Sequence, residues 1–189
     1  MSLFTGALRL WLLLTLLTGA LYPLLTTLLA QGLFPEQANG SLLTRDGKVT
    51  GSALIAQPFE QAGYFWSRPS AILYNGAGSG GSNLGPLNPQ LASDLAGRVK
   101  ALASEHHNQP IPVELVTTSA SGLDPHLSPA ALYFQIARVA RARQWDEADL
   151  RRLIDRQIES APPGVPAQPV VNVLRLNLAL DALTQHQTR

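Results

Sequence analysis

Apolar residues form one long run near the start of the chain and only short, spaced groups after it. Residues 10–30 are 21 consecutive positions without a charged side chain. A helix of this length is about 31 Å long at 1.5 Å per residue, which matches the ~30 Å hydrocarbon core of a bilayer. The pattern therefore predicts a short cytoplasmic tail at 1–9, a transmembrane helix at 10–33 and a separate domain at 34–189.

A cleaved signal peptide is the alternative interpretation of this run. Thr18-Gly19-Ala20 resembles a poor cleavage site, but the apolar residues continue for ten positions beyond Ala20. That length favours a retained span over a secreted binding module. Arg9 flanks the front of the run, and long domains are translocated largely regardless of their charge. We therefore expect a cytoplasmic N-terminus and an extracytoplasmic domain.

One face of the predicted span carries small and hydroxyl-bearing side chains. On a wheel of 3.6 residues per turn they fall within about 60° of Thr15. Such a stripe permits close helix–helix approach in lipid, although threonines can instead bond to carbonyls of their own helix. Pro23 predicts a kink just past the middle. We expect this face to pack against a membrane partner. The residues assigned to it are Thr15, Thr18, Gly19, Tyr22, Pro23 and Thr26.

Beyond the span, the pattern predicts a mixture of short strands and helices. Asp46-Gly47 lies between two strand-like segments and is the strongest signal for a two-residue hairpin turn. Alternation and β-branched residues predict strands at 112–117 and 169–174. Cap residues at Asn88, Ser128 and Asp146, together with apolar spacing, predict helices at 88–105, from 129 and from 146, and a short closing helix is expected at 177–183. The expected fold class is α+β, with one N-terminal transmembrane helix followed by a single mixed α+β domain.

Composition excludes several classes of site. The chain has no cysteine, so it forms neither disulfides nor thiolate zinc sites. Its net charge is +1, which argues against nucleic acid as a partner. His106 and His107 are adjacent and have no third ligand spaced to join them, so we expect no metal site. The aromatic cluster at 64–66 is expected to bury core surface rather than bind a ligand.

The glycine-rich loop at 75–89 resembles a dinucleotide-binding fingerprint only in part. Gly76, Gly78 and Gly81 match the glycine spacing, but prolines separate them from the next helix. The fingerprint requires the glycines to open a helix whose N-terminus meets the pyrophosphate. We therefore expect no nucleotide at this loop.

A second segment contains Ser119, Ser121, Asp124 and His126, which together suggest a Ser-His-Asp hydrolase. A catalytic triad requires members placed by different elements within hydrogen-bond reach, and the nucleophile-elbow motif is absent from this segment. Short hydroxyl and Asx residues before a helix more often form turns and caps. A membrane-tethered extracytoplasmic hydrolase using these residues remains the alternative function.

Short strings spread over nearly the whole chain carry a family resemblance. They include residues 79–84 (Ser-Gly-Gly-Ser-Asn-Leu) and residues 119–124 (Ser-Ala-Ser-Gly-Leu-Asp). The others are residues 21–27, 37–42, 51–55, 63–65, 68–70, 88–89, 112–117, 128–131, 169–172 and 176–181, with Gln57 and Phe59. In this order they resemble the C-subunit family of Kdp-type potassium-transporting ATPases.

The resemblance implies a non-catalytic accessory subunit in the bacterial inner membrane, with its main domain in the periplasm. Its partners would be a channel-like potassium-translocating subunit and a P-type ATPase subunit, and the complex would use ATP, Mg²⁺ and K⁺. The family's C subunit is needed for assembly and is described as a catalytic chaperone that raises ATP affinity. The resemblance also makes the motif loops interface candidates, namely Ser79, Gly80, Gly81, Ser82, Asn83, Ser119, Ser121, Gly122 and Asp124.

Overall fold

The computed structural model describes residues 3–45, 47–103, 109–162 and 164–187. The chain forms two compact units, Met1–Ser52 and Ala53–Arg189. Each unit is described by itself. The hairpin at 42–52 belongs to the first unit. A domain boundary at residue 34 stays a prediction.

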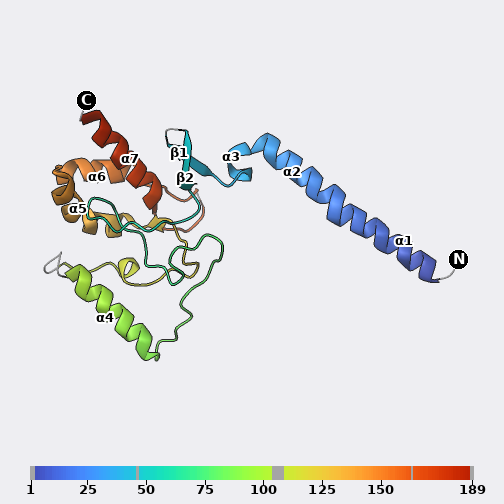
Figure 1. Ribbon diagram of the computed structural model, residues 1–189, viewed down its shortest axis with the longest axis horizontal. Coiled ribbons are helices and arrows are strands. Elements are labelled where there is room, and N and C mark those ends of the chain that lie inside the picture. Colours follow the sequence, from blue (N-terminus) through green and yellow to red (C-terminus); the bar gives the residue numbers. More distant parts are fainter. Residues whose placement is uncertain (1–2, 46, 104–108, 163, 188–189) are drawn as a thin grey trace. The chain divides into compact units, whose positions relative to one another are not determined.

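The first unit begins with a continuous apolar helix over Leu3–Leu33, which includes all of the predicted span. It consists of α1 (Leu3–Leu16), a π-helical turn η1 (Leu17–Leu21) and α2 (Tyr22–Leu33) (Figure 1). Its 31 residues are long and apolar enough to cross a membrane. A short helix α3 (Pro35–Ala38) follows.

The predicted hairpin is confirmed. Strands β1 (Leu42–Arg45) and β2 (Lys48–Ser52) pair antiparallel, and Arg45 faces Lys48 across a two-residue turn. Gly47 has φ +74°, as the predicted turn requires, whereas Asp46 lies outside the described residues. The register shifts by a bulge between Leu43 and Thr44.

The second unit is built on helices α4 (Pro89–Ala103), α5 (Pro129–Arg143), α6 (Glu147–Arg156) and α7 (Val173–Gln187). The predicted caps are confirmed. Ser128 Oγ accepts a hydrogen bond from Ala131 N, and Asp146 Oδ1 accepts one from Ala148 N. Asn88 Oδ1 accepts one from Gln90 N in front of α4. With one small sheet in each unit, the structure confirms the α+β prediction.

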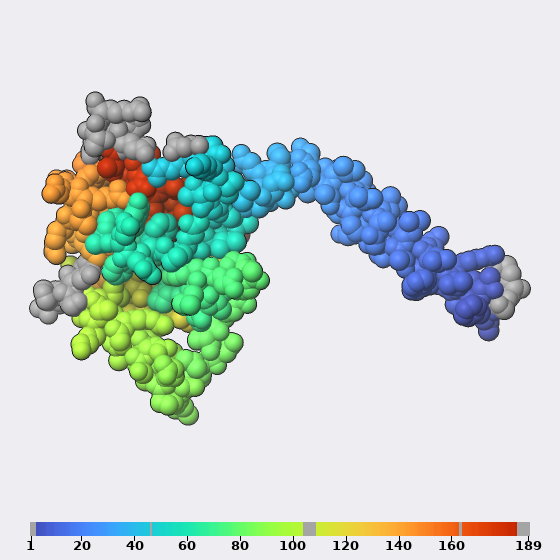
Figure 2. Space-filling view, viewed as in Figure 1, coloured from blue at the N-terminus to red at the C-terminus, as the bar shows by residue number. Residues whose placement is uncertain are grey.

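The core of the second unit lies between α5, α6 and α7, which gather on one side in Figure 1. Helix α5 is its centre, and Leu132 and Val139 are completely buried there. Helix α4 forms a projecting edge of this unit (Figures 1 and 2). Its apolar spacing places Leu91, Leu95, Val99 and Leu102 on one face, and of these only Leu102 is buried. Phe65 of the aromatic cluster is also fully buried. The assignment of Phe65 to the core is therefore confirmed.

The predicted strand at 112–117 is wrong. Val113–Leu115 forms a 3₁₀ turn, η2, in which Val113 O accepts hydrogen bonds from Val116 N and Thr117 N. Thr117 Oγ1 donates to the same carbonyl at 2.8 Å. Prolines 110 and 112 have no backbone N–H to offer a strand ladder, so the β-branched residues that follow coil instead.

The last predicted strand is shorter than expected and the last helix is longer. The strand β4 is only Val171–Asn172, paired antiparallel with β3 (His126–Leu127). Asn172 Oδ1 accepts a hydrogen bond from Arg175 N at 3.1 Å, so Asn172 ends the strand by capping α7 four residues before the predicted start.

Side chains from α5 and α7 form hydrogen bonds with the backbone of the aromatic segment at 64–66. They take the role that neighbouring strands have in a sheet. Asn177 accepts from Phe65 N at 3.0 Å and donates to Phe65 O at 2.9 Å. Gln135 accepts from Trp66 N at 2.8 Å and donates to Trp66 O at 3.2 Å. Arg138 donates to the carbonyl of Tyr64 at 3.0 Å. The buried amides thus satisfy backbone groups that a sheet would otherwise pair.

Candidate functional site

The glycine-rich loop lies against the segment at 119–122, which brings together the two groups of interface candidates. Gly80 N donates to Ser121 O at 2.8 Å, and Ser79 Oγ donates to the same oxygen at 3.1 Å. A Cβ on Gly81 would lie 2.9 Å from Ala120 O, so the two backbones meet more closely than a side chain allows. The structure thereby gives Gly80 and Gly81 a packing role.

Gly122 lies at the centre of this contact. Its φ is +67°, and a Cβ there would come within 2.5 Å of Ile72 Cγ1 and 2.7 Å of Gly80 O. Its own carbonyl accepts a hydrogen bond from Ser70 Oγ at 2.7 Å. Both the conformation and the close approach therefore require glycine at this position.

The turn at residues 70–74, which adjoins this contact through Ile72, is strained. Leu73 and Tyr74 are consecutive non-glycine residues with φ of +54° and +56°. Ser70 Oγ accepts hydrogen bonds from Ile72 N and Tyr74 N, and Tyr74 Oη donates to Arg68 O at 2.8 Å. Burial is the main cause that raises the pKa of Tyr74, so its hydroxyl stays a donor. These bonds hold a conformation that is costly for side-chain-bearing residues.

Arg68, Asp124 and His126 form a polar cluster beside the contact. Arg68 Nη1 lies 3.3 Å from Asp124 Oδ2, and His126 N donates to Asp124 Oδ1 at 3.0 Å. The His126 imidazole, with Nδ1 3.6 Å from Asp124 Oδ1, is the main cause that lowers the pKa of the Asp124 carboxyl. Partial burial opposes this effect, and the His126 N–H and Arg68 add to it. Asp124 is therefore an ionised structural anchor.

The serines of the suspected hydrolase serve turns. Ser119 is 3% exposed, and its carbonyl accepts a turn hydrogen bond from Gly122 N at 3.3 Å. Ser121 Oγ accepts from Leu123 N at 3.1 Å, in the same way that Asp124 accepts from His126 N. Within the described chain, no hydrogen bond joins either serine hydroxyl to His126. The turn interpretation is confirmed, and the geometry gives the hydrolase no support.

The remaining candidate residues lie partly inside and partly outside the described ranges. Asn83 is exposed with φ +53°, and Ser82 is half-buried. A hollow of about 550 Å³ borders Arg68, Ser79, Ser121 and Asp124. Across the described ranges there is no group of three or more His, Cys, Asp or Glu side chains that could hold a metal ion, while His106 and His107 lie outside those ranges. The interface role of the motif loops stays a prediction.

In the apolar helix, the hydroxyls of the proposed packing face bond locally. Thr18 Oγ1 donates to Leu14 O at 2.7 Å, and Thr26 Oγ1 donates to Tyr22 O at 2.9 Å. These bonds satisfy the hydroxyls in lipid without excluding a helix partner. Gly19 has open space around it, with no atom within 4 Å of an added Cβ. A second helix backbone therefore has room to approach at this position.

The π turn changes the geometry of this face. It lies immediately before Pro23, where the missing N–H and the ring disturb regular α-helical bonding. A π turn contains more residues than an α-helical turn. The residues after it are therefore rotated about the helix axis, relative to a wheel drawn with 3.6 residues per turn throughout. Thr15 therefore precedes the turn, Thr18 and Gly19 lie within it, and Tyr22 and Thr26 follow it.

The family model described as KdpC, the K⁺-transporting ATPase c chain, matches residues 4–182. Potassium-transporting ATPase KdpC subunits from Burkholderia mallei (strain SAVP1) and Burkholderia pseudomallei (strain K96243) are each 53% identical over 186 residues, covering 96% of both chains. The corresponding subunit from Sorangium cellulosum (strain So ce56) is 54% identical over 180 residues, covering 93% of this chain and 95% of its own.

The class indicated is a single-pass membrane subunit with an α+β fold, because the Leu3–Leu33 helix is long and apolar enough to cross a membrane once. The chain belongs to the KdpC family, the c chains of K⁺-transporting ATPases. Sequence reasoning identified the two motif loops but missed Ser70 and Arg68 as the residues that fasten them. The string at 68–70 was the available signal, because it belongs to the family pattern.

Proposed function

We propose that this chain is a non-catalytic accessory subunit of an ATP-driven, high-affinity potassium import complex and is needed for the assembly of that complex. The observation that carries the proposal is the family match over residues 4–182. The surface of the anchor supports it, because large apolar side chains from Leu3 to Phe34 are exposed along the whole helix. Gly19 adds a position where another helix can approach closely.

The partners in this proposal divide the chemistry between them. A channel-like subunit carries K⁺, and a P-type ATPase subunit hydrolyses ATP with Mg²⁺. The glycine-rich loop here is poorly suited to hold phosphate, because two of its amides already have acceptors. Gly78 N donates to Asn75 O, and Gly80 N donates to Ser121 O. In the proposal, this subunit therefore acts on ATP indirectly.

The proposed orientation places the N-terminus in the cytoplasm and the main domain outside the inner membrane. ATP is then on the opposite side of the membrane from the domain. An effect on ATP affinity, the catalytic-chaperone role, has to pass through the packed membrane helices as a coupling free energy between two sites.

The test compares ATP hydrolysis by the partner subunits before and after this subunit is added. The P-type and channel-like subunits are purified in detergent without this chain and are then supplemented with the full-length protein. Because coupling free energies are typically 1–3 kcal/mol, we expect the apparent KM for ATP to fall by about fivefold or more on addition. An unchanged KM in a complex that has bound the chain would contradict the affinity role and leave only assembly.

A further inference from the structure

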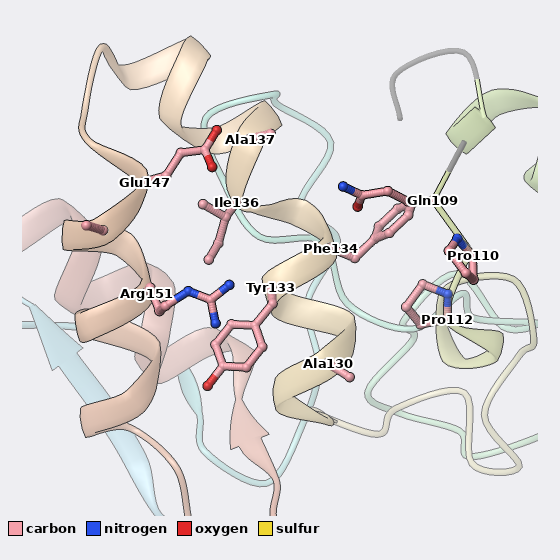
Figure 3. Close-up of a pocket in the computed structure, with 11 residues that line it drawn as sticks. Gln109, Pro110, Pro112, Ala130, Tyr133, Phe134, Ile136, Ala137, Glu147 and Arg151 are labelled. Atoms are coloured by element: carbon pink, nitrogen blue, oxygen red, sulfur yellow. The ribbon is translucent and has the colours of Figure 1, made fainter. Parts of the chain in front are cut away.

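The central helix α5 leaves one stripe uncovered. Its other faces are buried in the core, but Ala130, Tyr133 and Ala137 lie at the surface. They form the floor of a groove of about 680 Å³, bordered by α6 on one side and by Pro110 and Pro112 on the other (Figure 3). The groove is mostly apolar at its floor and charged along the α6 wall.

Arg151 lies on the α6 wall with its charge directed across the groove. Its guanidinium carbon is 4.3 Å from the centre of the Tyr133 ring (Figure 3). On a helix, Glu147 and Asp155 occupy the positions four residues before and after Arg151, where ion pairs usually form. In the described residues, however, Arg151 has no ion pair or hydrogen bond, and only the aromatic ring holds it.

Neither of these acids forms an ion pair with Arg151 in the part of the chain that the structure describes. Tyr133 Oη donates a hydrogen bond to Asp155 Oδ1, so one oxygen of that carboxylate pairs with the tyrosine hydroxyl. Figure 3 shows the Glu147 carboxylate pointing toward Ala137 and Ile136. Stacking on a ring leaves the edge of a planar guanidinium available for bidentate bonding. Arg151 is therefore a positioned cation whose N–H donors remain free for an acceptor from outside.

We propose that this groove binds a protein segment from a partner subunit that presents a carboxylate to Arg151 and an apolar side chain to the floor at Ala130 and Ala137. Charge complementarity selects this occupant, because an unpaired guanidinium at the rim favours an acidic residue. Glu147 lines the same groove one turn from Arg151 and repels a second carboxylate, so the segment presents a single acidic residue. This inference rests on the proposed function, since the partner is a subunit of the same complex.

The neighbouring Arg152 supplies a matched control. It lies on the same helix, is exposed, and forms an ion pair with Asp149 on a face that does not line the groove. Loss of its charge leaves the groove intact. Similarly, Ala142 is an exposed alanine of α5 outside the groove, whereas Ala137 lines it.

The experiment places the photo-crosslinking residue p-benzoylphenylalanine at position 137 or 142 of the full-length chain in the assembled complex in native membranes. We expect position 137 to crosslink to a partner-subunit peptide that contains Asp or Glu, at a yield well above that of position 142. Arg151→Gln is expected to lower the yield at position 137 about fivefold, and Arg152→Gln to leave it unchanged. Co-purification of the subunits is measured in parallel for every variant.

Three results would overturn the proposal while the subunits still co-purify. They are a crosslink only to a second copy of this chain, a crosslink only to lipid, and a yield at position 137 no higher than at position 142. Equal losses for Arg151→Gln and Arg152→Gln would also overturn the role of Arg151. If no subunit co-purifies with the unsubstituted chain, the proposed function itself fails, and this inference fails with it.

Discussion

Replacing Gly122 with alanine is expected to lower the free energy of unfolding of the full-length protein by about 3 kcal/mol or more. A left-handed conformation alone costs an L-residue about 1–2 kcal/mol. The added methyl group would also come within 2.5 Å of Ile72 Cγ1 and 2.7 Å of Gly80 O. The backbone oxygen moves only if the whole contact between the two motif loops opens. Chemical denaturation in detergent, followed by near-ultraviolet circular dichroism, measures the loss.

Gly164 is the matched control for this prediction. It has φ +88°, but no atom lies within 4 Å of an added Cβ. Gly164→Ala therefore adds only the conformational cost, and we expect a loss of about 1 kcal/mol. Equal losses at both positions would show that the contact of Gly122 with Gly80 does not contribute to stability.

Replacing Asn177 with alanine is expected to destabilise the second unit by about 3–4 kcal/mol. Asn177 is 1% exposed, and its amide satisfies both the N–H and the carbonyl of Phe65. Removal of the amide leaves two buried backbone groups without partners, each at a cost of about 1–3 kcal/mol. The same denaturation experiment measures this change, with tryptophan emission, to which Trp66 beside Phe65 contributes, as a second probe.

Asn75 provides the comparison for Asn177. Its Oδ1 accepts a hydrogen bond from Ala77 N in an exposed turn, where water replaces the lost partner. Asn75→Ala should cost about 1 kcal/mol or less. A loss for Asn177→Ala no larger than this value would mean that the amide clamp on Phe65 is not a significant source of stability.

Local signals predicted much of the fold. The caps at Ser128 and Asp146, the Asp-Gly hairpin turn and the apolar run each depend on residues within a few positions of one another. Such interactions are encoded in short windows of sequence, and the structure confirmed them. The buried position of Phe65 followed from its aromatic character alone.

The errors arose where distant residues decide the local structure. The segment at 112–117 has strand-forming residues, but it pairs with no strand of the described residues, and Thr117 bonds back to Val113. The amide of Asn177 reaches Phe65, which is 112 positions away. A sequence pattern shows that such a residue is polar, but it does not identify its buried partner.

The candidate sites were predicted to different degrees. The motif loops were identified by the family strings, but their mutual contact through Gly80, Ser121 and Gly122 emerged only from the structure. No sequence pattern predicted the groove at Arg151, because an arginine among acidic residues on a helix indicates ordinary surface ion pairs. The stacking on Tyr133 depends on the packing of α5 against α6.

The central claim is that the Leu3–Leu33 helix joins this subunit to its complex, and co-purification of an anchor variant tests it most directly. Gly19→Leu fills the open space at Gly19, whereas Ala20→Leu adds similar volume off the predicted stripe. Affinity purification of each full-length variant from native membranes would be compared with the unsubstituted chain. The account predicts that partner subunits are largely lost with Gly19→Leu and retained with Ala20→Leu. Full recovery of the partners with Gly19→Leu would contradict it.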